Sequence, residues 1–172
     1  ENLRNIVPDD PNKPYDVKDV IDLLVDKKSF YEISENYAQN IVIGFGRLDG
    51  KVIGIVANQP MFNAGAMDTD GIDKVISFLC LCDSFNIPLL FFHDIPGFLV
   101  GKAAERKRVA SKVMNYMNAL GLLSVPKISI IVRKTYGMAF WNMCGSGCAA
   151  DFLVAWPSAE MSFVDPASPA KR

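Results

Sequence analysis

The sequence contains a single histidine, and this scarcity limits the catalytic and metal sites that it can form. That residue is His93, and the cysteines at positions 80, 82, 144 and 148 have spacings that match no zinc-binding pattern. We therefore expect no metal in this chain, and we interpret the cysteines as reduced, structural thiols in a cytosolic setting. A Ser-His-Asp or Cys-His site would need His93, and no Gly-x-Ser-x-Gly motif is present. We interpret His93 as a strand-end residue that shapes a loop, with a direct chemical role as the alternative.

The chain also lacks long hydrophobic runs and an excess of basic charge. Its longest apolar runs, NIPLLFFHDIPGF and VPKISIIV, are far shorter than the roughly 20 residues that cross a bilayer. The polar first residues, ENLRNIVPDDPNKPYD, match neither a signal peptide nor a transit peptide. We therefore expect a protein that is not secreted and has no transmembrane segment. Its expected location is the cytoplasm or, in a eukaryote, the mitochondrial matrix. A net charge of −1 argues against nucleic acid as a partner.

Length and composition indicate one globular domain. The chain has 172 residues, of which 50% are hydrophobic and 22% are charged. Residues 1–14 are polar and contain several prolines, so we expect an arm or linker there, followed by one domain over residues 15–172. The chain begins with Glu1 and ends in PASPAKR, and we interpret it as a fragment of a longer protein.

Hydrophobic periodicity predicts an α/β domain with a largely parallel sheet. The dipeptide Asp49-Gly50 predicts a two-residue hairpin turn, because a type I′ turn requires positive φ at both central residues. Asp16 is a plausible N-cap for the first helix. The elements that we expect, in chain order, are a helix at 16–26, strands at 30–34, 41–47 and 52–58, a helix at 70–85, a strand at 87–94, a helix at 104–122, a strand at 127–133, a helix at 137–148 and short strands at 151–157 and 159–165.

The segment RKTYGMAFWNMCGSGCAAD carries the main functional question. Small residues and glycines follow the strand KISIIV, and a helix is expected to begin at Gly137, Met138 and Ala139. The first N–H groups of a helix have no partner within the helix and carry partial positive charge, so they can hold an oxyanion. The alternative is that Gly137 only allows the helix to pack closely on the sheet. Residue chemistry alone leaves both interpretations open.

Two further glycine-containing segments have the same ambiguity. DIPGF lies at the expected carboxyl end of a buried strand, where ligands of parallel α/β sheets bind, but it is also an ordinary proline–glycine turn. GFGRLDG lies within the expected hairpin, and we interpret its glycines as bulges or close contacts.

Five long segments give the chain a family resemblance. They are IVPDDPNKPYDVKDVI, NYAQNIVIGFGRLDGKVIGIVANQP, CDSFNIPLLFFHDIPGFLVG, VPKISIIVRKTYGMAF and ADFLVAWPSAEMSF. With these segments the chain resembles, over nearly its whole length, the C-terminal half of the carboxyltransferase subunits of biotin-dependent acyl-CoA carboxylases, of the propionyl-CoA carboxylase β type. Sodium-pumping biotin-dependent decarboxylases carry similar segments. The resemblance implies a crotonase-like fold, built as a spiral of ββα units.

The resemblance also implies an activity and partners. A carboxyl group moves between biotin, held on a carrier protein, and an acyl-CoA substrate. The implied partners are a biotin carboxyl carrier protein or biotin carboxylase subunit and the N-terminal carboxyltransferase half of a neighbouring subunit in a homo-oligomer. In the family, two backbone N–H groups stabilise the ureido oxygen of biotin, and they map onto Met138 and Ala139, preceded by Gly137.

This chain departs from the family beside the implied site. Met138 stands where the family has a second glycine, although its backbone N–H is retained. Trp141, next to Phe140, stands where the family usually has a smaller or acidic residue that influences acyl-chain preference. We take Trp141 and Phe140 as candidate substrate-binding residues.

The loop with Pro96, Gly97 and Phe98 is our candidate for a second wall of the biotin cleft. We expect the isolated fragment to be inactive. The alternatives are the corresponding domain of a decarboxylase coupled to a sodium pump and a non-catalytic assembly module.

Overall fold

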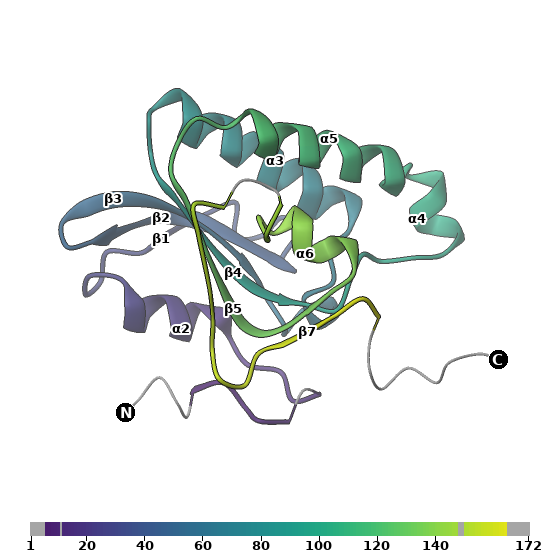
Figure 1. The fold of residues 1–172 in the computed structure, drawn as a ribbon, viewed down its shortest axis with the longest axis horizontal. Coiled ribbons are helices and arrows are strands. Elements are labelled where there is room, and N and C mark those ends of the chain that lie inside the picture. Colours follow the sequence, from purple (N-terminus) through teal and green to yellow (C-terminus); the bar gives the residue numbers. More distant parts are fainter. Residues whose placement is uncertain (1–5, 11, 148–149, 165–172) are drawn as a thin grey trace.

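The computed structural model describes residues 6–10, 12–147 and 150–164, which form one mixed sheet with helices on both faces (Figure 1). Within these residues the strands are ordered β1-β2-β3-β4-β5-β6, and β7 also pairs with β5. The strands are β1 Tyr31–Ile33, β2 Ile41–Leu48, β3 Lys51–Asn58, β4 Leu89–Ile95, β5 Lys127–Tyr136, β6 Phe152–Ala155 and β7 Glu160–Ser162. The helices are α2 Val17–Leu24, α3 Thr69–Ser84, α4 Lys102–Arg106, α5 Val109–Leu122 and α6 Met138–Asn142, with a 3₁₀ turn, η1, at Asn63–Gly65.

The sheet is antiparallel at one edge and parallel elsewhere, as the sequence predicts. β1, β2 and β3 pair antiparallel, whereas the pairs from β3 to β6 and the pair of β5 with β7 are parallel. The predicted turn between β2 and β3 is confirmed, since Asp49 and Gly50 have φ values of 51° and 75°. In β2, Gly44 allows close approach, because a Cβ there would lie 2.3 Å from the carbonyl oxygen of Tyr31.

Two apolar layers hold the helices on the sheet. On one face, α3, α5 and α6 pack over β4 and β5, around side chains such as Phe91 and Tyr116 (Figure 1). On the other face, α2 packs over the sheet through Val20 and Ile21. The predicted cap of α2 is confirmed, because the side chain of Asp16 accepts a hydrogen bond from the backbone N–H of Lys18.

The sequence predicts one continuous helix over residues 104–122, and this prediction is wrong because the helix is interrupted. The chain forms α4 and α5 with a break at Arg108, whose φ of 58° and ψ of 45° are left-handed. A left-handed residue ends the helical hydrogen-bond ladder, and the apolar spacing on either side of it carries no signal of such a break.

The predicted helix over residues 137–148 ends much earlier, at Asn142. Cys144 has a φ of 63° and donates its N–H to Trp141, and Gly145 donates to the carbonyl of Phe140 at 2.9 Å. This pair of bonds is a Schellman motif, which ends a helix by satisfying its last carbonyls. Cys148 lies outside the described residues. Cys80 and Cys82 are free thiols, as predicted.

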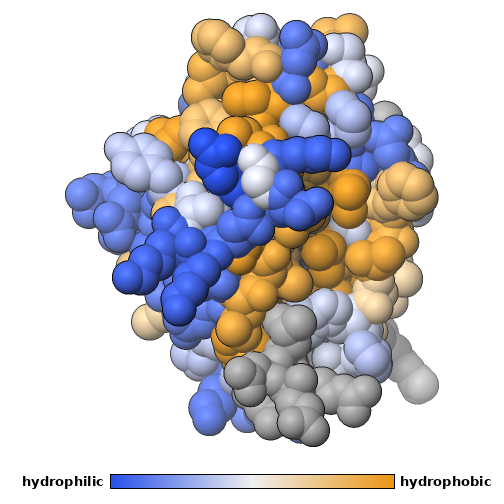
Figure 2. Space-filling model, turned by 90° about the vertical axis from the view of Figure 1, so that its left-hand side faces the viewer, coloured by the Kyte–Doolittle hydropathy of each residue, from blue (hydrophilic) through white to orange (hydrophobic). Residues whose placement is uncertain are grey.

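Apolar side chains also reach the surface. Figure 2 shows the end of the molecule that lies on the left of Figure 1, where apolar surface runs beside a hydrophilic band. In β6, Phe152 and Val154 are exposed, and both lie next to β5, opposite Ile128 and Ile130.

In the part of the chain that the structure describes, no helix is long and apolar enough to cross a membrane.

Candidate functional site

The candidate site begins where β5 ends and α6 starts. Gly137 turns the chain with a φ of 59° and a ψ of −143°, a conformation that side chains rarely allow. Its N–H donates to the carbonyl of Ser162 in β7 at 3.0 Å, and a Cβ at this position would lie 3.2 Å from the carbonyl oxygen of Phe163. Gly137 therefore has two structural roles: it makes the turn and it lets β7 approach.

The N–H groups of Met138 and Ala139 are the free donors of this turn. Phe140 donates to the carbonyl of Gly137 at 3.2 Å, but no acceptor among the described residues receives the N–H of Met138 or of Ala139. The side chain of Met138 is 43% exposed, whereas that of Ala139 is buried in the core. A helix start with two unpaired N–H groups can receive a negatively charged oxygen.

A pocket of about 300 Å³ opens beside this turn. Its apolar walls are the side chains of Phe140 and Trp141 on one side and of Met161 and Phe163 on the other. The remaining lining comes from Thr135, Gly137 and Ser162. The structure thus brings together three residues that the sequence analysis singled out, Gly137, Phe140 and Trp141. Met138 and Ala139, which lie between them in the chain, are not among the residues that line the pocket.

The lining residues from β7 and Thr135 were not anticipated. The pairing of Thr135 with Met161 joins strands that are separated by α6 and β6 in the chain, so local sequence patterns carry no signal for it. The one available signal was the position of Thr135, two residues before Gly137 on the same strand.

The loop with Pro96, Gly97 and Phe98 does not line this pocket. Its backbone is tied to Met67, because the carbonyl of Gly97 accepts from Met67 at 3.1 Å, and Phe98 forms an isolated bridge with the same residue. Phe98 also packs against the core that contains Ala139. The structure therefore ties this loop to Met67 and the core, and its role as a wall of the cleft stays a prediction.

His93 is buried beneath α6 and not at the end of its strand, since β4 continues to Ile95. Its ring centre lies 6.1 Å from that of Phe140. Neither ring nitrogen makes a hydrogen bond of normal geometry among the described residues, although the backbone of Met143 lies close enough to oppose the effect of burial on the pKa. Burial lowers the pKa of His93 to about 3, so the imidazole is neutral at physiological pH. In this position His93 contributes to the packing under α6.

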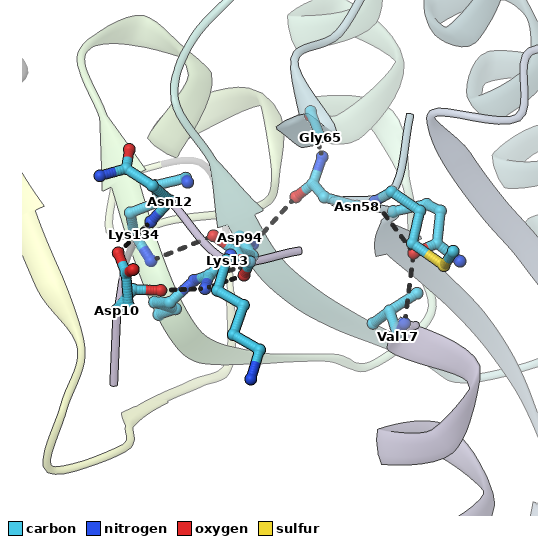
Figure 3. A network of polar contacts seen from close by, with 11 residues as sticks. Asp10, Asn12, Lys13, Val17, Asn58, Gly65, Asp94 and Lys134 are labelled. Atoms are coloured by element: carbon cyan, nitrogen blue, oxygen red, sulfur yellow. Dashed lines mark hydrogen bonds and ion pairs between the residues drawn. The ribbon is translucent and has the colours of Figure 1, made fainter. Parts of the chain in front are cut away.

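A buried ion pair joins the ends of β4 and β5, and sequence reasoning missed it. Both Nε and Nη2 of Arg133 lie 3.0 Å from Oδ2 of Asp94. Burial raises the pKa of the Asp94 carboxyl, and the guanidinium of Arg133 opposes this shift. Asp94 also donates its N–H to Asn58 at 3.2 Å, and Asn58 donates to the carbonyl of Gly65 (Figure 3). The network holds together the strands from which the loop and α6 emerge.

The same arginine holds the N-terminal segment in place. Nη1 of Arg133 donates to the backbone carbonyls of Asp10, at 3.1 Å, and of Lys13, at 2.9 Å. The ring of Tyr15 lies 5.0 Å from the guanidinium carbon, close enough for a cation–π interaction. The described part of the predicted arm therefore packs on the domain, and the boundary at residue 14 stays a prediction.

Within the described residues, no group of three or more His, Cys, Asp or Glu side chains could hold a metal ion. The site offers backbone N–H groups, one buried hydroxyl and an apolar pocket. Fold and site together define a crotonase-like α/β domain whose candidate chemistry depends on backbone donors.

The family follows from comparison with known proteins. Residues 1–171 match the carboxyl transferase domain family, and the chain belongs to this family. It is 45% identical over 166 residues to a propionyl-CoA carboxylase, carboxyltransferase subunit, of Haloferax mediterranei, with 96% of this chain and 32% of that protein covered. It is 42% identical over 170 residues to methylmalonyl-CoA decarboxylase subunit alpha of Veillonella parvula, with 99% of this chain and 33% of that protein covered.

A solved structure confirms the fold. The hexameric transcarboxylase 12S, with hydrolysed methylmalonyl-coenzyme A bound, matches with a TM-score of 0.92 and 42% identity, over 95% of this chain and 32% of that chain. The crotonase-like fold that the sequence implied is therefore correct. The chain spans about a third of the length of the relatives that it matches.

Proposed function

We propose that this chain forms part of a carboxyltransferase that moves a carboxyl group between carrier-bound biotin and an acyl-CoA. The observation that carries the proposal is the pair of unpaired N–H groups at Met138 and Ala139, next to a pocket with aromatic walls. Membership of the carboxyl transferase domain family supports the reaction class. The related carboxylase subunit and a transcarboxylase 12S structure with methylmalonyl-coenzyme A bound support the acyl-CoA substrate.

The residues present fit the ureido ring of biotin. Its oxygen needs hydrogen-bond donors, which the two N–H groups supply, and its ring atoms need an apolar enclosure, which Phe140, Trp141 and Phe163 supply. When bound, biotin carries the carboxyl group and accepts the α-proton of the acyl thioester, so the chemistry needs no side-chain base from this chain.

The role of Met138 and Ala139 is to stabilise negative charge on the ureido oxygen as the carboxyl group leaves. Fixed donors act most strongly where water is excluded, and losing one such donor costs roughly 3–4 kcal/mol of barrier in comparable sites. The Gly137 turn aims these donors, and its hydrogen bond to Ser162 holds the turn against β7.

Trp141 is proposed to limit the size of the acyl group. It lines the pocket and is 39% exposed, which supports a place at the opening, where the acyl group would approach the bound biotin. A large indole in this position favours short acyl chains over long ones. A decarboxylase role is the second candidate, and the similarity to the methylmalonyl-CoA decarboxylase subunit over 99% of this chain favours it.

The proposed partners are a biotin carrier protein, the N-terminal carboxyltransferase half of a neighbouring subunit, and further copies in an oligomer. The hexamer assembly of the related transcarboxylase supports the oligomer. Because the chain spans about a third of its relatives, we propose that the complete site needs a second half that this chain lacks.

An NMR titration of the 172-residue chain with a biotinylated peptide tests the proposed function, with coenzyme A as the comparison ligand. We expect the amide signals of Gly137, Met138 and Ala139 to shift with biotin and not with coenzyme A. If these signals do not move at millimolar biotin in a folded sample, and still do not move when the complementary half of the site is supplied, biotin is not held at this turn and the proposal is wrong.

A further inference from the structure

Thr135 lines the pocket and carries a buried hydroxyl group. The residue is 1% exposed, and its Oγ1 has no hydrogen-bond partner among the described residues. It lines the pocket together with Met161, its partner on the neighbouring strand β7. Neighbouring residues on paired parallel strands project to the same face of a sheet, so the Thr135 side chain lies on the pocket side.

A buried hydroxyl without a partner destabilises a fold, because it has lost water and gained no other hydrogen bond. Native proteins therefore satisfy nearly all such groups, and the exceptions call for an explanation. The hydroxyl of Thr135 lies in an apolar pocket, two residues before the Gly137 turn. Its lack of a partner is explained if a bound ligand supplies the missing hydrogen bond. A valine, which has nearly the same shape, would fill the same space without the cost.

We infer that Thr135 accepts a hydrogen bond from a ureido N–H of biotin bound in this pocket. The inference rests on the proposed function and adds a residue to it. A ureido group has one acceptor oxygen flanked by two N–H donors, so a complementary site needs donors and an acceptor. The N–H groups of Met138 and Ala139 are the donors, and the hydroxyl of Thr135 is the acceptor.

The arrangement also suits both forms of the ligand. A carboxyl group occupies one ureido nitrogen and leaves the N–H on the other nitrogen in place. The hydrogen bond to Thr135 is therefore available before and after transfer, and it fixes the orientation of the ring while the charge on the oxygen changes. Thr135 is a binding and orienting residue and takes no part in proton transfer.

The test compares Thr135→Val with Thr69→Val in the 172-residue chain. Thr69 is a matched control, because its hydroxyl is also buried and unpaired in the described residues, but it lies at the start of α3 and does not line the pocket. Thermal unfolding should show that neither variant is less stable than the wild type. Affinity for biotin methyl ester, measured by NMR, should fall about fivefold in Thr135→Val, as for one hydrogen bond between neutral groups, and stay unchanged in Thr69→Val.

A second ligand isolates the hydrogen bond. In biotin methyl ester methylated on both ureido nitrogens, no N–H remains. This ligand should bind the wild type and Thr135→Val with equal affinity. Methylation of the ligand and the valine substitution each remove the same hydrogen bond, so their effects on affinity should not add. Thr135→Ser, which retains the hydroxyl, should keep most of the affinity for biotin methyl ester.

The outcomes separate this inference from the proposed function. If biotin methyl ester shifts the amides of α6 but binds Thr135→Val as tightly as wild type, the inference is wrong and the proposed function stands. If the valine weakens both ligands equally, the effect is one of shape, and the inference is again wrong. If biotin shifts no α6 amide in the wild type, the 172-residue chain does not hold biotin at this turn and the inference is wrong, whereas the proposed function is decided by the same titration with the complementary half of the site present.

Discussion

Gly137 and Ser162 are joined by a backbone hydrogen bond of 3.0 Å, and this bond connects the start of α6 to β7. The pocket exists because of this connection: one wall comes from α6 and the other from the strand that follows it by about twenty residues of chain. The geometry of the turn therefore controls both the free N–H groups and the shape of the pocket.

We predict that Gly137→Ala destabilises the chain by about 1–3 kcal/mol, because alanine is strained at this φ and ψ and its Cβ would approach Phe163. Urea-induced unfolding measures the change. Gly121→Ala is the matched control: Gly121 lies within α5 with open space around it, so alanine should add about 0.4–1 kcal/mol of stability. Equal effects of the two substitutions would contradict the proposed role of the turn.

Arg133→Met should cost about 3–5 kcal/mol of unfolding free energy, because it leaves the carboxylate of Asp94 buried without its partner. It should also release the N-terminal segment, since the carbonyls of Asp10 and Lys13 lose their donor. Hydrogen exchange of residues 6–15 measures the release. Lys107→Met breaks an exposed pair with Asp70 and should have little effect on stability. Unchanged exchange in the Arg133 variant would show that the segment is held by other contacts.

The pH dependence of stability should carry a contribution from His93. Its pKa is about 3 in the folded chain and about 6.5 when unfolded, so the unfolded state binds the proton first as pH falls. The contribution is complete above pH 6.5 and is lost progressively between pH 6.5 and 3, by at most about 1.4 kcal/mol per pH unit. The contribution of His93 is measured as the difference in unfolding free energy between wild type and His93→Leu at each pH, because the pH-dependent contribution of Asp94 is common to both and cancels. A difference independent of pH would contradict a buried neutral imidazole.

Occupation of the pocket should be visible in the fluorescence of Trp141. The chain has two tryptophans, and Trp141 lines the pocket, whereas Trp156 packs against the core on the α2 side of the sheet. Adding biotin methyl ester should change the emission of Trp156→Phe, in which Trp141 is the reporter, and leave that of Trp141→Phe unchanged. The reverse pattern would place the ligand elsewhere.

Much of the fold could be predicted from the sequence because local patterns determine it. Runs of apolar residues predicted the strands β2 and β3, and helical spacing of apolar residues predicted α2 and α3. The Asp49-Gly50 dipeptide predicted the hairpin turn between β2 and β3. The errors occurred where a single backbone conformation overrides an apolar pattern, at Arg108 between α4 and α5 and at Cys144 after α6. Neither residue is a glycine, so neither carries the usual signal for a left-handed conformation.

The site could be predicted only where it lies within one stretch of chain. Gly137, Phe140 and Trp141 are near neighbours in sequence, and all three line the pocket. The Arg133–Asp94 pair and the Thr135–Met161 pairing depend on strand register between distant segments, which no local pattern encodes. The family resemblance directed attention to Met138 and Ala139 but was silent on the hydroxyl of Thr135.

The most direct test of the account is the affinity of Met138→Pro for biotin methyl ester, compared with that of Met138→Ala. Proline removes the N–H but is well tolerated at the first position of a helix, and alanine removes the same side chain while keeping the N–H. We predict that Met138→Pro binds at least about fivefold more weakly than Met138→Ala, with both variants folded. Equal affinity in the two variants would show that the N–H of Met138 does not hold the ureido oxygen, and would contradict the central claim.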